Sequence, residues 1–152
     1  MDVKYINPFI ESFTTVMPQL GFVTIQKGTV SVKGKQLVDT GVFIVIGIVG
    51  EVKGNVVYFI TLEHAKKIAS TMMMGMPVEE FDDMAQSAVS ELANMLTATA
   101  ATIFSNVGIT VDISTPTMLY GNDVSVKMNA TRVICVEMTA DHHPFHINIS
   151  LE

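Results

Sequence analysis

Three polar side chains, Ser87, Glu91 and Asn94, recur at helical spacing within the apolar and small-residue stretch AQSAVSELANMLTATA. At about 100° per residue, Glu91 lies at about +40° and Asn94 at about −20° from Ser87, so the three side chains form one row on a helix. The opposite arc carries the residues expected to face the core, which are Ala85, Ala88, Val89, Leu92, Met95, Leu96 and Ile103. The spacing therefore predicts that an acid and an amide are presented together on the outer face of one helix.

The composition of that outer face is unusual for a helix side that is merely solvated. The row continues upstream with Asp83 and downstream with Ala98 and Ala101, and residues 84–106 contain no Lys or Arg and a single Glu. A solvated face is the plain alternative interpretation, but such faces usually carry several Lys and Glu in i,i+4 pairs. Small side chains such as Ala98 leave room for the backbone of another molecule, so the face is typical of a docking surface.

The chemistry available to Glu91 and Asn94 is limited. No histidine lies next to Ser87 in the sequence to activate it as a nucleophile, and one carboxylate is too little for a metal cage. An amide can orient a water molecule for in-line attack on a phosphoryl group, as a glutamine does in GTPases. The carboxylate could then hold a cationic group of the partner, and the substrate would have to bring the metal ion and the phosphoryl group.

Length and charge narrow the class of protein. The chain has 152 residues, which predicts one domain over residues 1–152. Its net charge of −6 argues against nucleic acid as a partner, because such surfaces need clustered Lys and Arg. The longest apolar stretch, GVFIVIGIVG, is too short to cross a membrane as a helix. The single cysteine, Cys135, lies in an apolar run and is expected to be a buried, inert thiol, which suits a reducing cytoplasm.

The elements that must position the row follow from periodicity and turn signals. A first helix is predicted from Asn7 and Pro8 to Gly21, a second from a cap at Thr61 to Gly75, and a long third helix from near Glu79 to about Ser105. Strands are predicted at 28–34, 42–49, 55–62, 109–115, 123–130, 131–140 and 146–151. This order indicates an α+β fold, with an antiparallel β-sheet and long helices packed on one face.

Three other groups of residues could be assigned either a functional or a purely structural role. His142, His143 and His146 could in principle supply two ligands to a transition metal, although Pro144 predicts a turn there and further ligands are not evident. The cluster of Met72, Met73, Met74 and Met76 is interpreted as pliable core filler rather than a partner surface. Asp82 and Asp83 are expected to complement the dipole of the long helix.

The row resembles the signature of the chemotaxis phosphatases that include CheC and CheX. That signature is Ser or Asp, three residues, Glu, two residues, Asn, and a later proline, and it is matched by Ser87, Glu91 and Asn94 in SAVSELAN and by Pro116 in STP. The likeness extends to VIGIVGEVKGNVVYFIT, TMMMGMP and VDISTPT, and so to most of the chain. The single copy of the motif and the chain length are more similar to CheX than to CheC.

The resemblance implies a CheC-like fold and a phosphatase that hydrolyses the aspartyl-phosphate of a CheY-type response regulator in bacterial chemotaxis. It implies that Asn94 orients the attacking water and that Glu91 pairs with the regulator's active-site lysine. Ser87 and Pro116, with Ala98 of the small-residue track, would contact the partner. The family pattern implies a cytoplasmic homodimer with no cofactor of its own, because the regulator brings the Mg²⁺. A non-catalytic adaptor that binds a receiver domain, or a structural homodimer joined through the row, are the alternatives.

Overall fold

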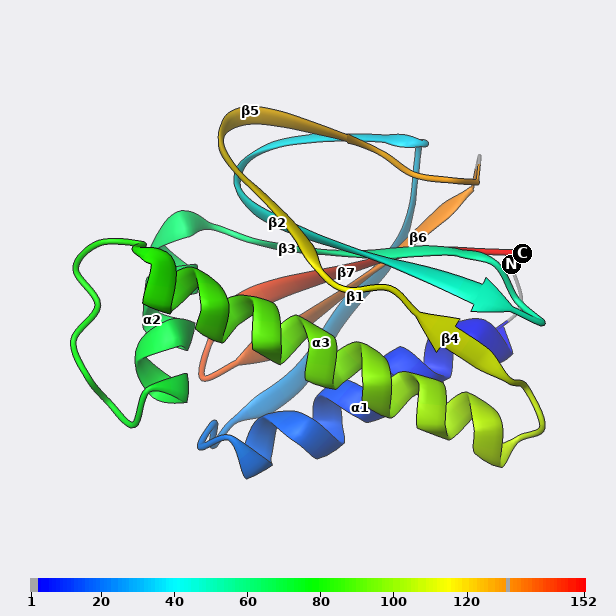
Figure 1. The fold of residues 1–152 in the computed structure, drawn as a ribbon, viewed down its shortest axis with the longest axis horizontal. Helices are drawn as coiled ribbons and strands as arrows, with labels where there is room; N and C mark the ends of the chain where they lie inside the picture. The colour runs from blue at the N-terminus through cyan, green and yellow to red at the C-terminus, as the bar shows by residue number, and fades with distance from the viewer. Residues whose placement is uncertain (1–2, 131) are drawn as a thin grey trace.

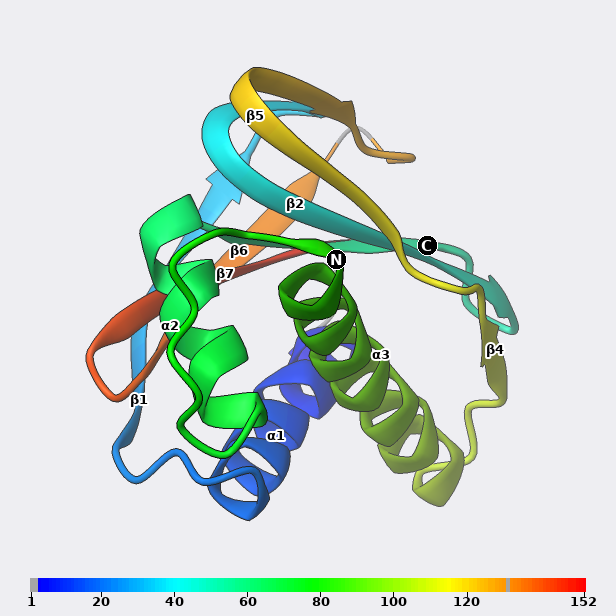
Figure 2. The same ribbon diagram turned by 60° about the vertical axis from the view of Figure 1, so that its left-hand side comes forward.

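A computed structural model describes residues 3–130 and 132–152 and shows three helices beside a seven-stranded sheet (Figure 1). The elements in chain order are α1 (Val3–Gln19), β1 (Ile25–Lys33), β2 (Gln36–Gly50), β3 (Gly54–Ile60), α2 (Leu62–Met72), α3 (Asp83–Asn106), β4 (Val111–Ile113), β5 (Thr117–Lys127), β6 (Val133–Ala140) and β7 (His143–Leu151). All strand pairs are antiparallel, and the three helices lie on one side of the sheet (Figures 1 and 2). The α+β prediction and the seven predicted strands are confirmed, although Thr131, at the start of one of them, lies outside the described residues.

The sheet runs in the order β1-β6-β7-β3-β2-β4, and β5 also pairs with β2. The long strand β2 pairs with β5 through residues 36–45 and with β4 through residues 48–50. The register of the β2–β5 pair shifts between Asp39 and Gly41, and there both strands bend away from the helices (Figure 2). Gly41 has φ +150°, and a Cβ at this position would lie 2.7 Å from the carbonyl oxygen of Ile60, so the bend requires glycine.

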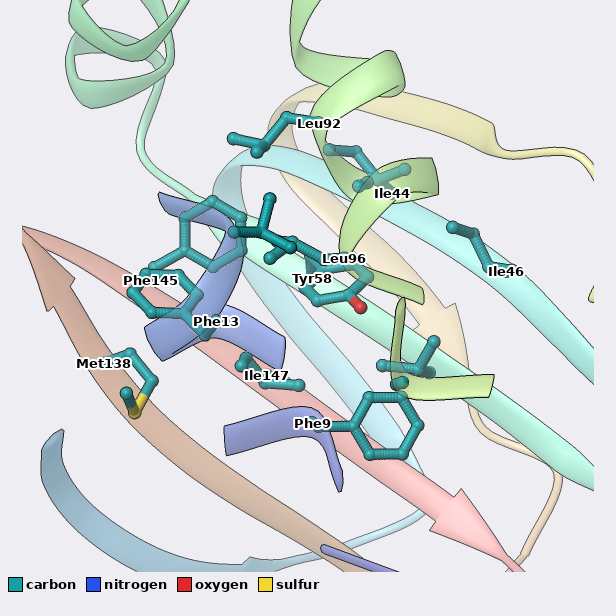
Figure 3. Close-up of a cluster of buried hydrophobic side chains, with 14 of the residues drawn as sticks. Phe9, Phe13, Ile44, Ile46, Tyr58, Leu92, Leu96, Met138, Phe145 and Ile147 are labelled. Atoms are coloured by element: carbon teal, nitrogen blue, oxygen red, sulfur yellow. The ribbon is translucent and has the colours of Figure 1, made fainter. Parts of the chain in front are cut away.

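The main core lies between the sheet and the helices. Phe13 of α1 contacts Phe145 of β7 with ring centroids 5.3 Å apart, and Phe145 in turn lies 5.7 Å from Tyr58 of β3 (Figure 3). Leu92 and Leu96 of α3 point into the same cluster and are at most 2% exposed. Burial of each such side chain contributes about 1.5–3 kcal/mol, so this packing fixes α3 against the sheet.

A smaller apolar cluster occupies the opposite face of the sheet, beneath the bent part of β2 and β5. Its members are Leu37, Phe43, Val57, Phe59, Val126, Met128 and Val133. Cys135 lies on this side and is 2% exposed, and burial raises the pKa of its thiol. The predicted burial of the thiol is therefore confirmed, and the raised pKa favours its protonated form, which is a poor nucleophile.

One boundary of each helix differs from the prediction, and the second helix ends at Met72 rather than at Gly75. The first helix includes Val3 and so begins well before Pro8, which lies buried inside it. Proline costs the helix one hydrogen bond at that point, but the burial of Ile6 and Phe9 on either side offsets the loss. The long helix begins at Asp83 rather than near Glu79.

The start of α3 is set by a cap. The Oδ1 atom of Asp82 accepts a hydrogen bond of 2.9 Å from the backbone N–H of Ala85, and Asp82 has extended backbone angles. The sequence suggested only that Asp82 complements the helix dipole, whereas the structure shows that Asp82 is the N-cap of α3. The predicted cap of the second helix is confirmed, because Thr61 Oγ1 accepts from the N–H of His64 at 3.3 Å.

The histidines do not converge on a metal site. His143 and His146 are an odd number of residues apart on β7, so their side chains leave opposite faces of the strand. The ring of His143 lies 5.0 Å from that of His64 on α2, whereas the ring of His146 lies 5.9 Å from Phe59 on the other face. No cluster of three metal-binding side chains occurs within residues 3–130 and 132–152.

Candidate functional site

The candidate site is the outward row of α3. The residues of this helix that are buried occupy an arc of about 140° on a helical wheel, and they are Ala85, Val89, Leu92, Ala93, Leu96, Thr97, Ala100 and Phe104. Ser87, Glu91 and Ala98 are exposed on the opposite side, and Asn94 is half-buried. The buried face is centred further toward Ala93 and Phe104 than predicted, so Ala88 and Met95 lie half-buried at its margin, and Ile103, near the end of the helix, is half-buried as well. The reason is that α3 packs against α1 and the sheet together, and this broadens its buried side.

Two buried hydrogen bonds fix the rotation of α3 about its axis. The hydroxyl oxygen of Tyr58 on β3 lies 2.9 Å from Thr97 Oγ1. The Thr97 hydroxyl donates a hydrogen bond to the carbonyl oxygen of Ala93, so the Tyr58 hydroxyl is the donor in its bond with Thr97. Burial raises the pKa of Tyr58, which keeps the phenol protonated as that donor. On the neighbouring side, Ser12 of α1 donates a hydrogen bond of 2.5 Å to the carbonyl oxygen of Leu96. These bonds hold the inner side of α3 in place and thereby leave the row on the outside.

The side chains of Glu91 and Asn94 have no partner among the described residues. Neither makes a hydrogen bond or an ion pair with any of the residues that the structure describes. The two residues are three positions apart on a regular helix, so their side chains are neighbours on its surface. The hydrogen-bonding capacity of one carboxylate and one amide is therefore available to another molecule.

Pro116 is positioned beside α3 by the edge of the sheet. The segment between β4 and β5 is tied to β2 through Ser114, whose N–H donates to the carbonyl of Gly47 at 2.9 Å and whose Oγ accepts from the N–H of Gly47 at 2.8 Å. Pro116 lies two residues after Ser114 and lines a surface hollow together with Ser87. Two residues separated by about thirty positions in the sequence are thus brought to one place by strand pairing.

The hollow contains residues that the sequence did not identify. It has a volume of about 350 Å³ and is lined by Asp83, Gln86, Ser87, Ser90, Pro116 and Met118. Gln86 joins the two walls, because its Nε2 donates to the hydroxyl of Tyr120 on β5 at 3.2 Å and to the carbonyl of Phe81 at 2.8 Å. No local pattern indicates this link, since the register of β5 depends on β2. Glu91, Asn94 and Ala98 lie outside the hollow, on the same helix.

None of the described helices is long and apolar enough to pass through a bilayer. The exposed row carries no basic residue, and the helix begins at two consecutive acids, Asp82 and Asp83. The site is therefore an acidic to neutral surface with a free carboxylate, a free amide and an adjoining hollow. Such an arrangement can bind a macromolecular partner that offers a basic group and can orient a water molecule, but it lacks a nucleophile of its own.

Comparison with known proteins identifies relatives over most of the chain. Residues 42–139 match the family model described as chemotaxis phosphatase CheX. A protein of Thermotoga maritima named CheY-P phosphatase CheX is 34% identical over 128 residues, which cover 84% of this chain and 82% of the relative.

Solved structures share the fold. A CheC-like superfamily protein from Shewanella sp. PV-4 has a TM-score of 0.88 and 26% identity, with 100% of this chain and 99% of that chain covered. The CheX–CheY–BeF3–Mg²⁺ complex from Borrelia burgdorferi contains a chain with a TM-score of 0.80 and 23% identity, with 97% of each chain covered.

Proposed function

The chain belongs to the chemotaxis phosphatase CheX family, and from this membership we propose that it hydrolyses the aspartyl-phosphate of a CheY-type response regulator. The observation that carries the proposal is the pair of unpartnered side chains, Glu91 and Asn94, on the outer face of α3. Their types and spacing match the family signature. The relative from Thermotoga maritima bears the name of the same activity, and the relative from Borrelia burgdorferi was solved in complex with CheY.

Asn94 orients the water that attacks the phosphorus atom. Its amide oxygen accepts a hydrogen bond from the water, and its N–H group donates to a phosphoryl oxygen, so the oxygen of the water is held in line with the bond to be broken while both protons of the water end on the phosphate product. As the new P–O bond forms, the bond between phosphorus and the aspartyl oxygen breaks, and the regulator's carboxylate leaves. The products are inorganic phosphate and the unmodified regulator. The Mg²⁺ ion comes with the regulator and belongs to the substrate.

Glu91 anchors the regulator beside Asn94. It lies close to one helical turn before Asn94, and its carboxylate forms an ion pair with the active-site lysine of the regulator. This contact fixes the angle at which the phosphoryl group approaches the amide. Ser87, Ala98 and Pro116 complete the contact surface around these two residues. The exposed and small side chains of Ser87 and Ala98 permit a close approach of the regulator's backbone.

We also propose that the protein acts as a cytoplasmic homodimer, with residues 1–152 forming one domain in each copy. The edge strand β1 supports association, because it pairs on one side only and exposes Val30 by 50% and Val32 by 67%. An interface on that edge leaves the row on α3 open to the regulator. Light scattering coupled to gel filtration measures the mass, and a monomer at micromolar concentration contradicts this part of the proposal.

The function is tested with a panel of phosphorylated receiver domains and a measurement of phosphate release. We expect this protein to accelerate the loss of phosphate from at least one CheY-type regulator in the presence of Mg²⁺. Binding of a phosphorylated regulator without acceleration supports the adaptor alternative instead. Self-association that protects the row on α3, with no binding of any receiver domain, supports the structural homodimer.

A further inference from the structure

A hollow of about 350 Å³ adjoins the row and is lined by Asp83, Gln86, Ser87, Ser90, Pro116 and Met118; the proposed hydrolytic step itself does not use it. Its two walls differ in chemistry. The α3 wall carries the carboxylate of Asp83 and the hydroxyls of Ser87 and Ser90, whereas the opposite wall carries the apolar surfaces of Pro116, just before β5, and of Met118 on β5. An acid with hydroxyls facing an apolar wall suits a ligand that is a cation at its tip and apolar along its stem.

Asp83 is available to such a ligand. Its side chain is exposed and makes no ion pair or hydrogen bond with the described residues. It is also not needed to cap the helix, because Asp82 performs that role. No Lys or Arg occurs in residues 84–106, so the helix has no cation of its own to neutralise this carboxylate. No basic side chain among the described residues therefore competes with a partner's basic group for this carboxylate.

The hollow lies within the area that a docked regulator must cover. Asp83 is eight residues before Glu91 on α3, which is about 12 Å along the helix axis. A standard interface buries about 800 Å² on each partner, a patch roughly 30 Å across. A regulator centred on Glu91 and Asn94 therefore reaches Asp83 and Pro116 as well.

The shape of the hollow is held from both sides. The bond from Gln86 to Tyr120 joins α3 to β5, and the ring of Phe81 packs edge-on against Tyr120 with the centroids 5.4 Å apart. The hollow is therefore formed before the partner arrives, and little conformational entropy is lost when a side chain enters it.

The geometry points to the hollow as a specificity site that receives one lysine or arginine side chain of the response regulator, outside the regulator's active site. The ammonium or guanidinium group forms an ion pair with Asp83 and does not contact Glu91. The aliphatic stem lies against Pro116 and Met118. This inference rests on the proposed function. It assigns to Asp83 the selection among regulators by their surface charge, and it leaves the hydrolytic step to Asn94.

The test compares Asp83→Asn and Asp83→Lys with the unmodified protein in steady-state hydrolysis of a phosphorylated regulator. A partly exposed ion pair contributes about 0.2–1 kcal/mol, so we expect Asp83→Asn to raise KM by about 1.4-fold to fivefold with kcat unchanged. The charge reversal should raise KM further, and at about 0.5 M salt, where screening is strong, the KM values should converge. Asp112→Asn is the matched control, because Asp112 is an exposed acid on β4 away from the hollow, and its KM should not change.

A second arm identifies the partner group. Single Lys→Glu and Arg→Glu variants of the regulator are tested with the unmodified protein and with Asp83→Lys. One regulator variant should bind the unmodified protein more weakly than the unmodified regulator does, and should regain its affinity with Asp83→Lys. Equal KM values for the unmodified, Asp83→Asn and Asp83→Lys proteins overturn the inference while leaving the proposed function intact. If the unmodified protein hydrolyses no phosphorylated regulator, the proposed function itself fails, so the two failures are distinguished.

Discussion

Replacing Asn94 with alanine should remove most of the activity without weakening the fold. The side chain is half-buried and makes no hydrogen bond with the described residues, so its removal leaves no buried group without a partner. Alanine is also the better helix former by up to about 0.7 kcal/mol in a helix interior. We therefore expect the free energy of unfolding of Asn94→Ala to equal or slightly exceed that of the unmodified protein.

The effect on catalysis should be much larger. A positioned polar group that acts in the transition state contributes about 2.7–4 kcal/mol, so its loss lowers kcat by about 10²–10³-fold. The assay follows phosphate release from a phosphorylated regulator with the enzyme at saturating and subsaturating substrate. Because the amide acts on the attacking water, the loss should lie in kcat, with a smaller change in KM.

A control on the same helix separates this role from a general effect of the substitution. Asn106 is the last residue of α3, is exposed, and lies twelve residues or about 18 Å beyond Asn94. Asn106→Ala should keep both the stability and the activity of the unmodified protein. Near-normal hydrolysis by Asn94→Ala refutes the mechanism, and a large loss of stability in that variant refutes the placement of Asn94 on the outer face.

Three further predictions concern binding, packing and pH. Glu91→Gln should weaken binding of the phosphorylated regulator in a titration by about twofold to tenfold, since a charge-assisted pair is lost, and unchanged affinity rejects the ion pair. Tyr58→Phe should lower the free energy of urea unfolding by about 1 kcal/mol, because the donor to Thr97 is removed, while kcat stays the same. If Tyr58→Phe lowers kcat as much as Asn94→Ala does, the claim that Tyr58 contributes to stability and not to catalysis is wrong. Burial lowers the pKa of His143 and of His146, so the folded protein binds protons less readily than the unfolded chain. The urea midpoint should therefore fall as pH decreases from about 7 to about 5, and His143→Gln with His146→Gln should flatten this dependence.

Much of the fold could be predicted because its signals are local. Alternation in segments such as NVVYFITL indicates strands, and the threonine cap marks the start of the second helix, although that helix ends at Met72, three residues before the predicted glycine. The errors arose where tertiary packing overrides a local preference. Pro8 predicts a helix start, but the burial of Ile6 extends α1 toward the N-terminus. The acids before α3 allow several caps, and the structure uses Asp82.

The core face of α3 illustrates the same limit. Periodicity alone centres the buried arc on Leu92 and Leu96, and both residues are indeed buried. The additional burial of Ala93 and Phe104 depends on where α1 lies, and Phe104 contacts Phe9 of that helix with the ring centroids 5.9 Å apart. Helix geometry determines which residues share a face, whereas the elements packed against the helix determine how wide its buried side is.

The sequence by itself determined that Ser87, Glu91 and Asn94 share one side of a helix, because the angle between successive residues of an α-helix is a local property of the backbone. Only the tertiary structure decided that Pro116 and Met118 lie beside that helix and form a hollow with it, and that Tyr120 accepts a hydrogen bond from Gln86. Their position follows from the pairing of β2 with β4 and β5, which joins residues more than sixty positions apart. Such pairing is selected by the burial of whole faces of the sheet, and no short spacing in the chain encodes it.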